Sequence, residues 1–139
     1  MKIICLYGKA NIGKTTTLTM LANEIVKRNL GSMGEYESDK FKMVLNDGRI
    51  VCITTSGDTG EVASDNIEFV GKHNPDIWFT AMRTSGESTN LGPYFQAEEV
   101  CYYKKNSITL LGNVTSSLIN KMQYENNLCD MKALLYQTI

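Results

Sequence analysis

The segment Gly8 to Thr15 constrains the fold of this chain more than any other part of the sequence. It reads Gly-Lys-Ala-Asn-Ile-Gly-Lys-Thr, and its two glycines permit tight backbone bends and a close approach to a partner that a Cβ would obstruct. The apolar residues 2–7 directly before it predict a buried strand. Residues 14–29 after it carry apolar side chains at helical spacing and predict an amphipathic helix.

Strands and helices continue to alternate along the chain. The further predicted strands cover residues 41–45, 49–54, 76–82 and 107–111. The further predicted helices cover residues 59–72, 94–102 and 115–137. The polar, glycine-bearing residues 31–40 predict a loop, as do residues 83–92.

This alternation predicts one α/β domain over residues 1–139, with a mostly parallel sheet and helices on both faces. Asn46-Asp47-Gly48 joins two of the strands and is typical of a hairpin turn, because these residues tolerate a positive φ. The hairpin is therefore expected to add one antiparallel strand at an edge of the sheet.

Composition excludes several classes of function. The formal net charge of −1 argues against binding nucleic acid, which usually requires a basic face. We expect no membrane association, since no apolar run reaches the roughly 18 residues that a membrane span needs. The cysteines, at positions 5, 52, 101 and 129, form no C-x-x-C pair, so a zinc site is not expected. Isolated thiols suit a reducing cytoplasm.

Gly8 to Thr15 matches the pattern G-x-x-x-x-G-K-[ST] in full. The main-chain N–H groups of such a loop, here including Asn11, Ile12 and Gly13, form a concave anion site with the N-terminus of the following helix. Lys14 would reach the β- and γ-phosphate oxygens of a nucleoside triphosphate. The Thr15 hydroxyl would bind Mg²⁺, and Thr16 would hold the α-phosphate.

On this motif and its position between a strand and a helix, the sequence resembles the P-loop NTPase superfamily. The resemblance is specific over residues 8–15 and loose over the rest of the chain. It implies a three-layer P-loop NTPase-like fold with a Mg²⁺·nucleotide site at the carboxyl ends of the strands. ATP is the expected nucleotide, because no N/T-K-x-D guanine-reading segment follows residues 76–82.

The resemblance also implies a carboxylate at the end of a neighbouring strand, to hold Mg²⁺ directly or through water. Asp58 is the candidate, with Thr55 and Ser56 as possible ligands of metal-bound water. The acid does not directly follow the apolar run, which departs from the pattern of the superfamily. Asp58 and Glu61 also fit a capping box at the start of a helix, and both roles stay open.

Arg83 begins the polar loop after the next strand and is a candidate contact to phosphate oxygens or to an acceptor. The alternative is a surface arginine without a role in the site. Three functions follow from these residues: an ATPase, a small kinase acting on a nucleotide or metabolite, and a nucleotide-regulated module that binds a protein partner. Arginines are few, which argues against a kinase with an arginine-rich lid.

Overall fold

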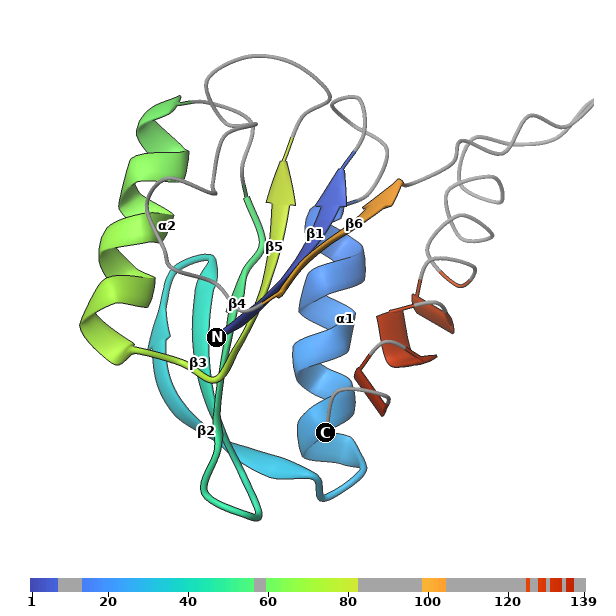
Figure 1. Cartoon of the computed structure of the whole chain (residues 1–139). Coiled ribbons are helices and arrows are strands. Elements are labelled where there is room, and N and C mark those ends of the chain that lie inside the picture. Colours follow the sequence, from blue (N-terminus) through green and yellow to red (C-terminus); the bar gives the residue numbers. More distant parts are fainter. Residues whose placement is uncertain are drawn as a thin grey trace, which may run out of the picture.

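The computed structural model describes residues 1–7, 14–56, 60–82 and 99–104, with residues 125, 128, 129, 131–133, 135 and 136 (Figure 1). Its strands are β1 (Lys2–Tyr7), β2 (Gly31–Glu37), β3 (Lys40–Leu45), β4 (Ile50–Thr54), β5 (Ile77–Met82) and β6 (Glu99–Lys104). Its helices are α1 (Lys14–Lys27) and α2 (Gly60–His73). The described residues from 125 onward are helical too.

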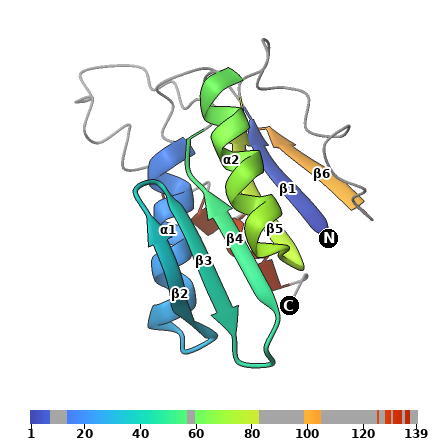
Figure 2. The same cartoon turned by 90° about the vertical axis from the view of Figure 1, so that its left-hand side faces the viewer.

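The strands form one six-stranded sheet in the order β2-β3-β4-β5-β1-β6. Four neighbouring strands are parallel: β4 pairs with β5, β5 with β1, and β1 with β6. The remaining pairings, β2 with β3 and β3 with β4, are antiparallel. Figure 2 shows β2, β3 and β4 side by side as an antiparallel meander.

The prediction of a three-layer P-loop NTPase-like fold, with a mostly parallel sheet and one antiparallel strand at its edge, is wrong. The sheet is mixed, and the β2–β3–β4 meander makes up half of its strands. The antiparallel strand β3 lies inside the sheet, between β2 and β4. The edge position belongs to β2, which the sequence predicted to be a loop.

The polar composition of β2 explains this error. Six of its seven residues are exposed, so the strand lacks the alternation of apolar and polar residues by which a half-buried strand is recognised. Main-chain pairing with β3 forms it instead. At Gly31 a Cβ would lie 2.5 Å from the Val44 carbonyl oxygen, so a glycine is required where the two strands approach.

The prediction of a helix over residues 94–102 is also wrong in the part that the structure describes. Residues Glu99–Lys104 form β6, which pairs with β1 along its whole length. Its sequence, Glu-Val-Cys-Tyr-Tyr-Lys, is rich in residue types that favour strands. The predicted strand at residues 107–111 lies outside the described residues, as does the loop at 83–92.

The elements predicted at residues 2–7, 14–29, 41–45, 49–54, 59–72 and 76–82 are confirmed to within a few residues. Of the helix predicted at residues 115–137, the residues that the structure describes are helical. Helix α1 ends at Lys27, earlier than predicted, because Asn29 takes a left-handed conformation with φ of 55°. The main-chain N–H of Leu30 then donates to the Ile25 carbonyl at 3.0 Å, which closes the helix. No helix among the described residues is long and apolar enough to cross a membrane.

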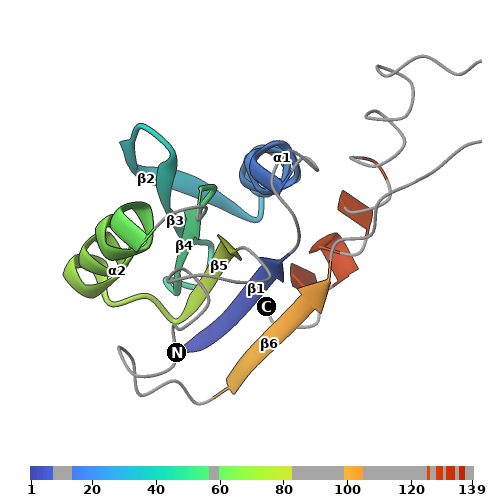
Figure 3. The ribbon, with the colours of Figure 1, turned by 90° about the horizontal axis from the view of Figure 1, so that it is seen from above.

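The core has two parts, one on each face of the sheet (Figure 3). On one face, buried side chains of α1 pack against alternate residues of β1, β4 and β5, and Met131 and Leu135 join this cluster. On the other face, Phe69 and Val70 of α2 pack against Trp78 and the remaining alternate residues. Cys5 and Cys52 belong to this second cluster and are free buried thiols.

Candidate functional site

The candidate site lies where the parallel strands end. Because β4, β5, β1 and β6 run in the same direction, their carboxyl ends meet at one edge of the sheet. Strand β1 ends there at Tyr7, and Lys14 is the first residue of α1. The glycine-containing segment between them lies outside the described residues, but both of its flanking elements are in place.

The first turn of α1 is attached to the end of β4. The Thr15 hydroxyl donates a hydrogen bond to the Thr55 main-chain carbonyl at 2.9 Å. Lys14, one residue earlier, is only 5% exposed, whereas Thr15 is exposed and Thr16 is half-buried. A buried lysine at the N-terminus of a helix is rare, since its charge needs polar surroundings. Its burial therefore points to a local role rather than to a solvated surface chain.

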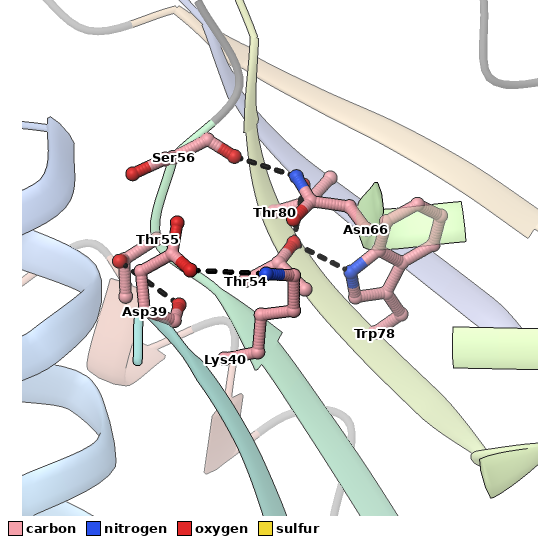
Figure 4. A network of polar contacts seen from close by, with 8 residues as sticks. All are labelled: Asp39, Lys40, Thr54, Thr55, Ser56, Asn66, Trp78 and Thr80. Atoms are coloured by element: carbon pink, nitrogen blue, oxygen red, sulfur yellow. Dashed lines mark hydrogen bonds and ion pairs between the residues drawn. The ribbon is translucent and has the colours of Figure 1, made fainter. Parts of the chain in front are cut away.

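Thr55 is held in turn by the β2–β3 turn (Figure 4). Its main-chain N–H and its hydroxyl both donate to the Asp39 carbonyl, each at 3.0 Å. The turn is tight, and Ser38 takes a positive φ of 54° within it. The end of β4 is thus connected on one side to α1 and on the other to the meander.

The side chain of Asp39 makes its own contacts at this position. The Lys40 ammonium lies 3.1 Å from its Oδ1 atom, and Ser56 also hydrogen-bonds to the carboxylate. Burial by itself would raise the pKa of Asp39, but the hydrogen bonds to its carboxylate and the positive charge of Lys40 together lower the pKa below its usual value. The carboxylate is therefore ionised at neutral pH, and the Asp39 side chain is 29% exposed.

Helix α2 contacts the same segment from the other face. The side-chain amide of Asn66 donates to the Ser56 carbonyl at 2.6 Å, as Figure 4 shows. Asn66 is 2% exposed, and its Oδ1 atom is buried without a hydrogen-bond partner in the described part of the chain. Buried oxygen atoms of this kind usually accept a hydrogen bond, so this atom could accept one beside the site.

A buried network connects the end of β4 to the middle of β5. The Trp78 indole N–H donates to the Thr54 hydroxyl at 2.9 Å, and Thr54 donates to the Thr80 hydroxyl at 2.7 Å. All three residues are at most 1% exposed. The end of β4, which carries Thr55 and Ser56, is therefore held to its neighbouring strand by buried side-chain hydrogen bonds as well as by main-chain pairing.

The structure brings together some of the residues that the sequence predicted for the site. Lys14, Thr15 and Thr16 lie at the carboxyl edge, and Thr55 and Ser56, predicted to bind water near the metal, lie beside them. Six other predicted residues fall outside the described residues and stay predictions: Gly8, Asn11, Ile12, Gly13, Asp58 and Arg83.

Asp39 was missed by sequence reasoning, because residues 31–40 were expected to form a loop. The signal that would have revealed it is the pairing of residues 31–37 with β3. Once that strand is recognised, Ser38-Asp39 becomes a strand-to-strand turn at the same edge as the motif.

Metal binding by the protein alone is not supported in the described part of the chain, which holds no group of three or more His, Cys, Asp and Glu residues able to bind an ion. A Mg²⁺ ion that binds together with a nucleotide needs fewer protein ligands, because phosphates and waters supply most of its coordination. Hard oxygen ligands suit it, and the Thr15 hydroxyl and the Asp39 carboxylate are of this kind. Since Thr15 gives its proton to Thr55, its lone pairs are available to a cation.

A groove lies elsewhere, between α2 and the β2–β3 strands. It has a volume of about 330 Å³ and is lined by Glu37, Lys40, Asp65, Glu68, Phe69 and Lys72. Neither Lys14 nor Thr15 contributes to it. The groove is therefore separate from the first turn of α1, although Lys40 borders both regions.

Comparisons of the chain with protein-family models, with curated proteins and with solved structures found no match. The function is therefore argued from the chemistry of the site, because a fold by itself does not determine function.

Proposed function

We propose that this chain binds a nucleoside triphosphate with Mg²⁺ and hydrolyses it, with ATP as the expected nucleotide and the cytoplasm as its location. The binding motif is Gly8 to Thr15. The proposal concerns this site and does not depend on the overall fold of the superfamily that the motif resembles.

One observation carries the proposal: Lys14 and Thr15, the last two residues of the motif, begin a helix at the carboxyl edge of the parallel strands. The N-terminus of a helix attracts anions through its free N–H groups and its dipole. The burial of Lys14 supports a lysine directed along the site rather than into solvent. The bond from Thr15 to Thr55 supports an oriented hydroxyl.

The residues then have distinct roles. Lys14 holds the terminal phosphates as a point charge, and the loop N–H groups with Thr16 hold the inner ones. Thr15 presents its oxygen to the metal, while Thr55 accepts its proton. Mg²⁺, when bound, offsets the negative charge of the phosphates and of the transition state. Asp58 stays the predicted carboxylate for Mg²⁺, and Arg83 stays the predicted contact to phosphate oxygens or to an acceptor.

Nucleotide affinity in Lys14→Ala and Lys27→Ala tests the proposal, because both variants remove one lysine from α1. Lys27 is exposed in the last turn, far from the motif. Losing a charge-assisted hydrogen bond costs about 1.5–3 kcal/mol, or roughly ten- to a hundredfold in Kd. We expect that loss for Mg²⁺·ATP in Lys14→Ala only, measured by isothermal titration calorimetry. Equal affinities of the two variants would contradict the proposal.

Hydrolysis is tested separately by the release of inorganic phosphate from ATP. We expect release that requires Mg²⁺ and that falls in Lys14→Ala, Asp58→Asn and Arg83→Ala. ATP binding without phosphate release, and without a labelled acceptor, would leave a nucleotide-regulated binding module. A phosphorylated acceptor would identify a kinase.

A further inference from the structure

We propose that Asp39, in the turn between β2 and β3, supplies the carboxylate for the Mg²⁺ of the nucleotide site. The inference rests on the proposed function and adds a residue that the motif does not contain. It concerns a turn of the antiparallel meander, which the sequence did not place near the site.

The main-chain hydrogen bonds fix the position of this turn. Thr55 accepts the Thr15 hydroxyl through its carbonyl and donates twice to the Asp39 carbonyl. A single residue thus links the expected metal ligand of α1 to the turn that carries Asp39. The turn cannot move away from Thr15 unless the end of β4 moves with it.

The side chain has the chemistry that the metal requires. Mg²⁺ in nucleotide sites is typically held by one or two carboxylates, by phosphates and by water. The Asp39 carboxylate is partly exposed and accepts a hydrogen bond from the Lys40 ammonium. Lys40 neutralises part of its charge at 3.1 Å, so a divalent cation would compete with a monovalent ammonium for the same oxygens.

Other described aspartates that lie in turns are at the opposite edge of the sheet. Asp47 belongs to the β3–β4 hairpin, where it pairs with Arg49 at 2.8 Å. Asp76 directly precedes β5 and accepts the main-chain N–H of Ile50. Among these three aspartates of the described residues, only Asp39 is hydrogen-bonded through its main chain to Thr55, the residue that accepts the Thr15 hydroxyl.

The experiment measures how much Mg²⁺ strengthens the binding of a non-hydrolysable ATP analogue. Calorimetric titrations in EDTA and in saturating MgCl₂ give this gain for each variant. We expect Asp39→Asn to reduce the gain by about ten- to a hundredfold, the usual loss when a group that orients a metal is removed. Asp47→Asn is the matched control, since it too removes an aspartate from a turn and from an ion pair, and it should keep the gain.

A second variant separates a metal role from a purely structural one. Lys40→Met removes the ion pair but leaves the carboxylate, so it should keep the wild-type gain or increase it. If Lys40→Met loses the gain as Asp39→Asn does, or if Asp39→Asn keeps it, the assignment of Asp39 is overturned while nucleotide binding stands. If the wild-type protein binds the analogue under neither condition, the proposed function itself fails, and the assignment fails with it.

Discussion

The Thr15 hydroxyl donates a hydrogen bond of 2.9 Å to the main-chain carbonyl of Thr55, a residue 40 positions further along the chain. This bond joins the first turn of α1 to the end of a strand that is not its neighbour in sequence. It also orients the Thr15 oxygen, because a hydroxyl has one proton and two lone pairs. With the proton directed to Thr55, the lone pairs are left for a cation.

Replacing Thr15 by valine removes this hydroxyl with almost no change of shape. We expect Thr15→Val to lower the free energy of unfolding by about 1 kcal/mol, because one partly buried hydrogen bond is lost. We also expect the affinity for an ATP analogue to lose most of its dependence on Mg²⁺. Thr15→Ser retains the hydroxyl and should restore both properties, as measured by urea unfolding and by calorimetry.

Thr19→Val is the control for a hydroxyl on the same helix, since the Thr19 hydroxyl donates to the Thr15 carbonyl at 2.8 Å and is exposed. This variant should leave the Mg²⁺ dependence unchanged. A loss of Mg²⁺ dependence in Thr19→Val as large as in Thr15→Val would show that the effect comes from the helix and not from the Thr15 oxygen.

The parallel half of the sheet was predictable because its strands are apolar and lie between recognisable helices. Residues 77–81 of β5 and residues 3–6 of β1 are buried, and continuous apolar runs of this kind predict interior strands. The meander was only half predictable. Its two inner strands carry an apolar pattern, but exposed β2 does not, and its pairing depends on the backbone rather than on its side chains.

The same distinction applies to the candidate site. The motif at residues 8–15 is local in sequence, so its candidate residues could be named without a structure. The contact between Asp39 and Thr55 joins a turn to a strand end across the meander. No spacing rule encodes such a contact, because it exists only once the strand order is fixed.

The buried network at Thr54 provides a prediction about stability. Thr54 accepts the Trp78 indole N–H and donates to Thr80, and all three residues are buried. Thr54→Val keeps the volume but removes both hydrogen bonds, so we expect the free energy of unfolding to fall by about 2–3 kcal/mol. Chemical denaturation followed by tryptophan fluorescence measures this change directly at Trp78.

Thr80→Val is the comparison for this prediction. It removes the bond between the two hydroxyls but leaves the indole with Thr54, so its cost should be smaller, about 1 kcal/mol. If the two variants are equally destabilised, the indole hydrogen bond contributes little and the network is not organised around Thr54.

Glu24 of α1 gives a prediction about pH. Its carboxylate accepts a hydrogen bond from Arg28 at 2.8 Å, and the Lys132 ammonium lies 3.2 Å from the same oxygen. The Arg28 hydrogen bond is the largest effect on the pKa of Glu24; burial opposes it, and Lys132 adds to it, so that the pKa is lowered from 4.5. Through Lys132, the pair also ties the helical residues near the C-terminus to α1.

The sign of the effect on stability follows from this direction. Well above pH 4.5, Glu24 is ionised in both the folded and the unfolded chain, and its full contribution to stability is present. As the pH falls below this value, the unfolded chain takes up the proton first, and the contribution is lost through the lowered pKa of the folded state. Glu24→Gln should therefore be less stable than the wild type at about pH 7 and approach it at about pH 3. Urea unfolding at both pH values measures the difference in free energy of unfolding, with the exposed Glu68→Gln as control. If wild type and Glu24→Gln differ by the same amount at the two pH values, the ionised form of Glu24 does not stabilise the contact between α1 and Lys132.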